Sequence, residues 1–208
     1  MNRISDVIFG EIDMQPTVIF RDFEERDIDF IYKCKNDEKL NSLIVAQYHP
    51  FTYEEAVEWV HGCMGEHETY KFWAIATNDL ERRIVGWVSI SHININNKSA
   101  VFHGIVIGDN DYKDGFAWIE SYLYIMDYVF TKLQFHRLYG ENLVEHKHSI
   151  KINRALFFQQ EGIQRDAIYK NGAFHDIDIY SILDVEYLTH RENGDYEIPS
   201  IIDRILTR

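Results

Sequence analysis

The stretch IVIGDNDYKDGFAWIES, residues 105–121, contains the three patterns that decide the fold. An apolar run typical of a strand stops at Gly108, the polar residues 109–113 follow, and a helical pattern begins after Gly115. A glycine turn between a strand and a helix start is a recurring way to hold a phosphate group, because backbone N–H groups at a helix start are unpaired. An ordinary strand-to-helix turn has the same pattern, so both interpretations stand for this stretch alone.

The composition is that of a folded domain with an acidic surface. The chain has 208 residues, of which 46% are hydrophobic and 14% aromatic, and its formal net charge is −13. This length can bury a substantial core, so we expect a single domain over residues 1–208. The negative charge argues against nucleic-acid phosphate or an anionic membrane as a partner. A cationic substrate is compatible with it, although solubility alone also explains an acidic surface.

Cysteine use and the N-terminus indicate a cytoplasmic protein. Cys34 and Cys63 lie in helical patterns and lack the close spacing of a metal site or a disulfide framework, which favours a reducing compartment. Residues 1–16 carry acidic side chains and no apolar segment of signal-peptide length. No apolar run approaches the roughly 18 residues that a membrane span needs.

Hydrophobic periodicity predicts helices and strands of ordinary length. Thr52 and Glu55 form a capping box at the start of one helix, and Gly162 is expected to close another helix at its C-terminus. The pair Asn171–Gly172 is the strongest hairpin signal, and an apolar pattern within 185–208 predicts a last helix. The expected helices span 24–37, 52–64, 115–132 and 148–162, and the expected strands span 17–23, 71–79, 82–93, 99–108, 135–143, 162–170 and 173–183.

The order of these elements predicts an α+β fold. It is neither a regular strand–helix alternation nor an all-β pattern, so a mixed, mostly antiparallel sheet flanked by helices is expected. The strand–helix–strand segment 99–143 requires a parallel crossover, which is right-handed in nearly all proteins.

Three stretches of the sequence carry a family resemblance. They are IFRDFEERDIDFIYKCKND (19–37), IVIGDNDYKDGFAWIES (105–121) and EGIQRDAIYKNGAFHDIDIYSILDVEY (161–187). In order and spacing they resemble the GNAT superfamily of N-acetyltransferases, in the branch of ribosomal-protein N-terminal, spermidine and amino-sugar acetyltransferases. The resemblance covers about residues 16–188 and leaves 189–208 as a C-terminal extension. It implies a sheet of about seven strands that splays between the fourth and fifth strands.

The resemblance implies acetyl-CoA as the cofactor, bound at the turn quoted above. Gly115 would let the backbone approach the diphosphate, and Ala117 would keep the first helical turn slim. The N–H groups of residues 112–117 would donate to the phosphates, and the edge of strand 105–107 would pair with the pantetheine arm. Asp114 departs from the family pattern, because a carboxylate repels the diphosphate unless it points to solvent. The expected cofactor contacts are Ile105, Val106, Ile107, Tyr112, Lys113, Asp114, Gly115, Phe116, Ala117 and Asn153, the last as a polar contact at a helix start.

Acetyl transfer to an amine requires a base for the amine, a donor for the thioester carbonyl and help for the leaving thiolate. His103, in register with Ile105 and Ile107, is the candidate catalytic base because an imidazole titrates near neutral pH. A core or surface histidine without a catalytic role fits the same pattern. Many members of the family protonate the thiolate with a tyrosine four residues before the glycine that closes the next helix. Here that position is Phe158, which has no hydroxyl, so water or another group must assist.

The acceptor side is expected at the loop between the first two helices and at the last hairpin. Tyr48, His49 and Phe51 in the segment QYHPF either shape a substrate pocket or pack against their neighbours. Asp176, which matches a family aspartate, either binds the substrate or braces the hairpin.

The sequence therefore predicts an acetyl-CoA-dependent N-acetyltransferase that works by direct transfer in a ternary complex. The acceptor would be a primary amine of a protein N-terminus, a polyamine or an amino sugar, and a homodimer is a compatible assembly. No metal site is expected, because His146 and His148 have no carboxylate partner at ligand spacing. The alternative is a GNAT-fold module that binds CoA as a sensor or scaffold without catalysis, and Asp114 and Phe158 favour it.

Overall fold

The computed structural model describes residues 16–207. The expected absence of a signal-type segment concerns residues 1–16, nearly all of which lie outside this range. The strands are β1 (Val18–Arg21), β2 (Tyr70–Thr77), β3 (Ile84–Asn94), β4 (Ser99–Ile107), β5 (Arg137–Leu143), β6 (Gln159–Lys170) and β7 (Ala173–Leu183). The helical elements are η1 (Glu25–Asp27), α2 (Ile28–Lys35), α3 (Glu38–Asn41), α4 (Tyr53–Cys63), η2 (Asn110–Tyr112), α5 (Phe116–Asp127), η3 (Tyr128–Lys132), α6 (Lys147–Ala155), α7 (Asp184–Glu192) and α8 (Ile198–Thr207).

The described strands form one mixed sheet in the order β1-β2-β3-β4-β5-β7-β6. Every neighbouring pair is antiparallel except β4 and β5. These two are parallel because the α5 crossover returns the chain to the end of the sheet at which β4 begins. The predicted α+β fold, with one parallel pair in a mostly antiparallel sheet of seven strands, is therefore confirmed. Within residues 16–207, no helix is long and apolar enough to cross a membrane.

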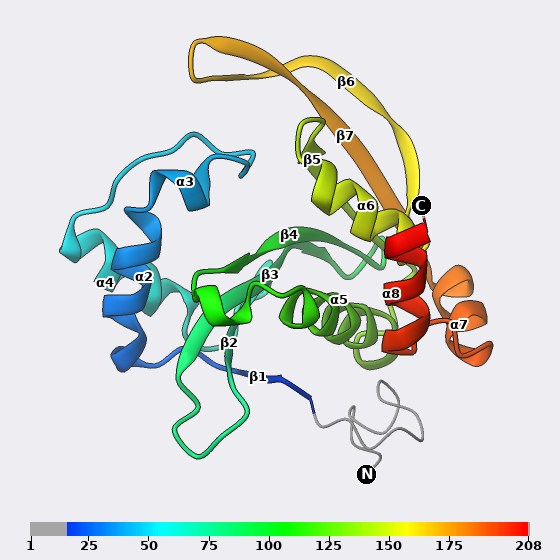
Figure 1. The fold of residues 1–208 in the computed structure, drawn as a ribbon, viewed down its shortest axis with the longest axis horizontal. Helices are drawn as coiled ribbons and strands as arrows, with labels where there is room; N and C mark the ends of the chain where they lie inside the picture. Colours follow the sequence, from blue (N-terminus) through cyan, green and yellow to red (C-terminus); the bar gives the residue numbers. More distant parts are fainter. Residues whose placement is uncertain (1–15, 208) are drawn as a thin grey trace.

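Two hydrophobic cores hold helices on opposite faces of the sheet. One core packs α5, α6 and α8 against the face that carries Phe102, Ile105 and Ile107. The other packs α2 and α4 against the face that carries Ala74 and Trp87. The β6–β7 hairpin extends beyond both layers and arches toward α3 (Figure 1).

The predicted helix cap and hairpin turn, which depend on residues close together in the chain, are confirmed. Thr52 Oγ1 accepts from the Glu55 N–H at 3.2 Å, and Glu55 Oε2 accepts from the Thr52 N–H at 2.7 Å, which completes the capping box of α4. Asn171 and Gly172 join β6 to β7 with φ of 52° and 82°, the left-handed pair that a two-residue hairpin turn requires. The expected last helix is α8, and α7 precedes it.

The predicted end of the helix over 148–162 is wrong. This helix, α6, ends at Ala155, and Gly162 lies within β6, where it pairs with Ile179. Phe157 takes the left-handed closing position instead, with φ of 67°. The Phe157 N–H donates to Arg154 O at 3.2 Å and the Phe158 N–H donates to Asn153 O at 2.9 Å, the bond pair of a Schellman motif.

Tertiary contacts explain why a phenylalanine adopts a backbone conformation that favours glycine. The Phe157 ring stacks on His190 of α7 with centroids 3.5 Å apart, and the Arg204 guanidinium of α8 lies 4.6 Å from the same ring. Arg204 Nε also donates to Ala155 O at 2.8 Å, which pairs a carbonyl at the end of α6. The C-terminal helices therefore stabilise the end of α6.

Candidate functional site

The sheet forks between β4 and β5. The two strands pair only over Ser99–Val101 and Arg137–Tyr139, although β4 continues to Ile107. A bulge bends β4 at this point: Ile90 pairs with Phe102 and Ser89 with Gly104, which leaves His103 as the extra residue. Gly104 has φ of 123°, a value that disfavours any side chain.

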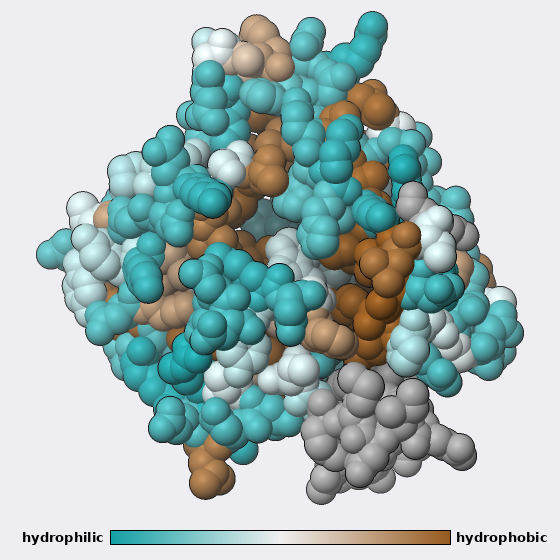
Figure 2. Space-filling model, in the orientation of Figure 1, coloured by the Kyte–Doolittle hydropathy of each residue, from teal (hydrophilic) through white to brown (hydrophobic). Residues whose placement is uncertain are grey.

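Beyond the fork, the edge of β4 that faces β5 has no paired strand among the described residues, so its N–H and C=O groups are available to an extended ligand. Ile105, Val106 and Ile107 lie on this edge, as expected. The space-filling view shows a hollow at the centre of this face, between α3 and α6 and beneath the β6–β7 hairpin (Figure 2).

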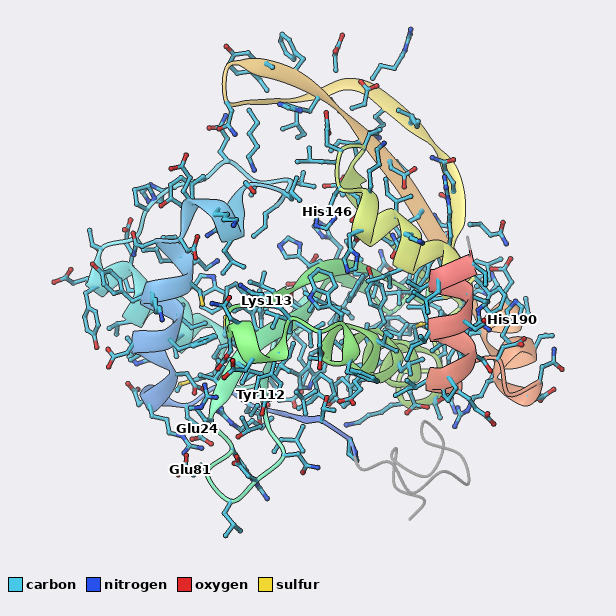
Figure 3. The ribbon with its side chains drawn as sticks, viewed as in Figure 1. Glu24, Glu81, Tyr112, Lys113, His146 and His190 are labelled. Atoms are coloured by element: carbon cyan, nitrogen blue, oxygen red, sulfur yellow. The ribbon has the colours of Figure 1, made fainter. Side chains whose placement is uncertain are left out.

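The loop after β4 leads into α5 through a left-handed glycine. Gly115 is the N-cap with φ of 103°, and an added Cβ would meet no atom within 4 Å, so its backbone faces open space. Ala117 is 1% exposed and packs in the core, and its small side chain lets the first turn of α5 lie close to the sheet. The first N–H groups of α5 have no acceptor inside the helix and carry the positive end of its dipole. Figure 3 shows Tyr112 and Lys113 in this loop.

The loop offers fewer free donors than the sequence predicts. The N–H groups of Tyr112 and Lys113 donate to Asp109 O and Asn110 O at 3.3 Å each. The Phe116 N–H donates to Asp114 Oδ1 at 3.0 Å. The donors expected from residues 112–117 are thus partly used within the loop. Lys113 Nζ donates to Asn110 Oδ1 at 2.8 Å and is likewise held inside the loop.

Asp114 lies where an anion would bind. Its carboxylate caps the start of α5, at the site that the helix dipole makes attractive to phosphate. Asp114 is exposed, but its carboxylate is held at the start of α5, where it would compete with a diphosphate for the Phe116 N–H.

His103 lies on the opposite face of the sheet from the one expected. Phe102, Ile105 and Ile107 all point into the core beside α5, and the bulge turns His103 to the other face, where its Nδ1 is 3.5 Å from Ser91 Oγ. The predicted register of His103 with Ile105 and Ile107 is therefore wrong.

The environment of His103 suits a base at neutral pH. Its side chain reaches solvent, but the surrounding protein removes enough water that partial burial lowers the pKa of the imidazole, with His92 and Lys35 lowering it further. The neutral form is consequently favoured.

A buried polar network lies at the fork on the side of β5. The Tyr122 hydroxyl of α5 donates to Asn153 Oδ1 at 2.7 Å, and Ser149 Oγ donates to Asn142 Oδ1 at 2.9 Å. The Tyr122 hydroxyl is also 3.5 Å from Ser149 Oγ, which links the two pairs. Asn142 Nδ2 and Asn153 Nδ2 are buried and have no hydrogen-bond partner among the described residues.

Comparison with known proteins identifies the family. Residues 17–159 match the family described as acetyltransferase (GNAT) domain. The chain belongs to this family. It is an N-acetyltransferase, and the predicted resemblance is confirmed.

Relatives match almost over their whole length. A spermidine N(1)-acetyltransferase from Vibrio cholerae is 25% identical over 181 residues, which cover 86% of this chain and 100% of the relative. An uncharacterized N-acetyltransferase p20 from Bacillus licheniformis is 27% identical over 171 residues, 80% of this chain and 93% of the relative. The crystal structure of the Vibrio cholerae spermidine N-acetyltransferase in complex with CoA and spermine has a TM-score of 0.73 at 24% identity, covering 84% of this chain and 99% of that one.

In this GNAT enzyme, the observed end of α6 moves the position of the family tyrosine. The residue four places before the closing residue Phe157 is Asn153, so Phe158 does not occupy that position. Phe158 is buried, with its ring 6.1 Å from that of Tyr122 and 5.4 Å from that of Tyr180. Asn153 lies in the last turn of α6 and not at a helix start. His146 is the N-cap of α6, where its Nδ1 accepts from the Ser149 N–H at 3.1 Å.

The predicted acceptor residues of the acetyltransferase lie apart from one another. Tyr48 is half-buried and its hydroxyl donates to Asn36 O at 3.2 Å, and exposed His49 lies 3.2 Å from Glu55. Phe51 packs against the core beneath α2 and α4. Asp176 Oδ1 accepts from the Asp166 N–H at 2.8 Å at a bulge of β6, so it braces the hairpin. Contact of these residues with a substrate remains a prediction.

Sequence reasoning missed two lysines on the acceptor side. Lys170, at the tip of β6, is 2% exposed. Its Nζ donates to the backbone carbonyl of Asn41, the last residue of α3, and to the carbonyls of Ile44 and Ala46 in the loop that follows. Lys35 Nζ lies 4.4 to 5.3 Å from three aromatic rings, those of Trp59, Trp87 and Phe51. Burial lowers the pKa of both lysines. Neither has a sequence signal, because each depends on contacts with distant segments.

The histidines at the start of α6 flank an aromatic ring. The centroids of His146 and His148 lie 6.4 Å and 6.0 Å from that of Trp118 on α5. His146 lies at the start of α6 in Figure 3. Across residues 16–207, no group of three His, Cys, Asp or Glu side chains has the arrangement of a metal site.

Proposed function

We propose that this enzyme transfers the acetyl group of acetyl-CoA directly to a primary amine of a polyamine, with both substrates bound together. The observation that supports this most is the fork between β4 and β5, with the left-handed Gly115 and the start of α5 beside it. An unpaired strand edge suits a pantetheine arm, and a helix start suits a diphosphate. The unpaired amide of Asn153 adds a buried polar donor on the side of β5.

The described residues fit CoA, which supplies the acetyl group as a thioester when bound. The edge of Ile105–Ile107 would hold the arm, and the free N–H groups at the start of α5 would bind the diphosphate. Asp114 already occupies one of these N–H groups, so its carboxylate must leave when a phosphate binds. We therefore expect modest affinity for CoA.

His103 would accept the proton that the amine loses, directly or through a water molecule. It lies on β4 next to the strand edge that would hold the cofactor, and its lowered pKa keeps the imidazole neutral at physiological pH. The acceptor would enter between the loop at Tyr48–Phe51 and the β6–β7 hairpin. Lys170 ties this hairpin to the carbonyls of Asn41, Ile44 and Ala46, just before that loop.

A polyamine is favoured among the amine acceptors for two reasons. The relative from Vibrio cholerae that aligns over its full length acts on spermidine, and the net charge of −13 attracts cations. An amino sugar and a protein N-terminus are the other classes to compare.

One experiment tests both the activity and the acceptor class. Purified protein is incubated with acetyl-CoA and, separately, with spermidine, spermine, glucosamine or a peptide with a free N-terminus, while released thiol and product mass are followed. Thiol release with monoacetylated polyamine is expected, and release with only the sugar or the peptide would overturn the acceptor class. Binding of CoA without thiol release for every amine would support the non-catalytic module.

A further inference from the structure

The two unpaired amide nitrogens at the fork require an explanation. Asn153 is 3% exposed, and its Nδ2 has no hydrogen-bond partner among the described residues. A buried donor without an acceptor costs about 1–3 kcal/mol, so such groups usually mark a missing ligand or a functional role. Asn153 therefore has an unused donor inside the protein.

The position of this donor coincides with the apex of the fork. Tyr122, whose hydroxyl donates to Asn153, packs against Phe102 of β4 with ring centroids 4.7 Å apart. A Cβ added to Gly140 of β5 would lie 2.9 Å from Phe102 O and 2.7 Å from the Tyr180 hydroxyl. Phe102 and Gly140 are the residues that follow the last β4–β5 pair, Val101 and Tyr139. The Asn153 amide therefore lies close to the point where the strands separate.

Tyr122 fixes which way the amide points. Its hydroxyl donates to Asn153 Oδ1 at 2.7 Å, so the carbonyl side of the amide is held and Nδ2 is directed away from Tyr122. Burial raises the pKa of Tyr122, which keeps this hydroxyl protonated and donating. The ring is itself held by packing against Phe102, with centroids 4.7 Å apart.

Other groups near Asn153 do not take this donor. Burial raises the pKa of Tyr180, and the nearby Asn153 side chain opposes part of this rise. The Tyr180 hydroxyl nevertheless does not form a hydrogen bond of acceptable geometry with Asn153 Nδ2. Phe158 has no polar atom to offer. Among the described residues, Asn153 Nδ2 is therefore left free to donate a hydrogen bond to a ligand.

We propose that Asn153 is a catalytic residue whose Nδ2 donates a hydrogen bond to the sulfur of CoA, and that Tyr122 is the positioning residue that aims it. This inference rests on the proposed function, because it assumes that CoA binds in the fork. An amide does not release its proton, so the leaving sulfur is stabilised as a thiolate by a hydrogen bond and is not protonated by Asn153.

The lone pair of the amine forms the new C–N bond to the acetyl carbon, and the C–S bond breaks with its electron pair on sulfur. The proton lost by the amine passes to His103 and then to solvent. Asn153 donates the same hydrogen bond throughout and is unchanged.

Calorimetry with CoA and with desulfo-CoA, which lacks the sulfur, tests the contact without catalysis. At an alkaline pH where the CoA thiol is ionised, about 10, the wild-type protein should bind CoA on the order of 10-fold or more tighter than desulfo-CoA. In Asn153→Ala this ratio should fall to about one, while affinity for desulfo-CoA is unchanged. A wild-type ratio near one, or a ratio kept in Asn153→Ala, overturns the proposal.

Two further variants separate the donor from its support. Asn142→Ala removes the other unpaired amide and should keep the ratio, so loss of the ratio in Asn142→Ala alone would assign the contact to Asn142 and overturn the proposal. Tyr122→Phe keeps the Asn153 side chain but releases it, and should lower the ratio and kcat together with little change in KM for acetyl-CoA. An unchanged ratio in Tyr122→Phe overturns the positioning role.

The outcomes also separate this inference from the function on which it rests. Heat of binding with both ligands but no difference between them overturns the role of Asn153 alone. No heat with either ligand overturns the proposed CoA site, and the role of Asn153 with it.

Discussion

The Tyr122 hydroxyl lies 2.7 Å from Asn153 Oδ1 and joins α5 to α6 at the place where β4 and β5 separate. The helix that follows the loop proposed to bind the diphosphate and the helix that follows β5 are thus linked by buried hydrogen bonds of the Tyr122 hydroxyl with Asn153 and Ser149.

Removal of the carboxylate that caps α5 should strengthen CoA binding. In Asp114→Asn the side chain keeps its shape but loses the charge that competes with a phosphate at the helix start. Calorimetry should show about fivefold tighter binding of CoA, an effect that shrinks at high salt. Asp111→Asn, one turn earlier in the loop, is the control and should have a smaller effect. Equal or weaker binding in Asp114→Asn would show that the phosphate does not occupy this position.

Loss of the proposed base should change both rate and pH dependence. His103→Gln should lower kcat/KM about 100-fold or more. In the wild type the acidic limb of the pH profile should have its midpoint below the ordinary histidine value, because partial burial, His92 and Lys35 all lower the pKa of His103. This limb should be absent in His103→Gln. A profile whose acidic limb survives the substitution would remove His103 from the mechanism.

The contact between α8 and α6 should contribute measurable stability. Arg204→Ala removes the hydrogen bond to Ala155 O and the guanidinium beside the Phe157 ring, and should lower the free energy of unfolding by about 1–2 kcal/mol. Urea unfolding checks this value. Arg204→Lys keeps the charge near the ring and should lose less. If Arg204→Ala unfolds at the wild-type midpoint, the C-terminal helices do not hold the end of α6.

Glu161 should make stability depend on acid pH. Hydrogen bonds from Arg137 (2.6 and 2.7 Å) and from Ser181 (2.7 Å) lower the pKa of its carboxylate to about 2. A lowered folded-state pKa stabilises the fold above the unfolded value, near 4.5, and this contribution is lost as the pH falls toward 2. Partial exposure of the pair reduces the effect. Urea midpoints across this range should fall less in Glu161→Gln than in the wild type, and parallel curves for the two proteins would refute the assignment.

Release of the hairpin tip should affect the acceptor more than the cofactor. Lys170→Met removes three hydrogen bonds, one to the last residue of α3 and two to the loop after it, while keeping the length of the side chain. The KM for the amine should rise on the order of 10-fold with CoA affinity unchanged, since the loop loses its fixed position. Gln47→Ala, which breaks a single contact with Tyr169 O, should have a smaller effect. A matching loss of CoA affinity in Lys170→Met would indicate a general structural defect.

The sequence predicts those features that depend on near neighbours in the chain. The Thr52 capping box, the Asn171–Gly172 turn and the glycine start of α5 at Gly115 are all present. The end of α6 could not be predicted, because Phe157 is held in a left-handed conformation by His190 and Arg204, which are distant in sequence.

That single error explains most of what the sequence misplaced in the site. Counting back from the expected helix end places the family tyrosine position at Phe158, whereas the same count from the observed end of α6 gives Asn153. A bulge in β4 similarly turned His103 to the other face of the sheet, and a one-residue bulge has no reliable sequence signal. Lys170 and Lys35 required the assembled fold, since their partners lie on other elements.

A crystal structure of the protein soaked with CoA tests the central claim most directly. The account predicts the pantetheine arm paired with the edge of Ile105–Ile107, the diphosphate at the start of α5 with the Asp114 carboxylate displaced, and the sulfur within hydrogen-bond distance of Asn153 Nδ2. Density for CoA outside the fork, or a fork closed by side chains with no CoA bound, would contradict it.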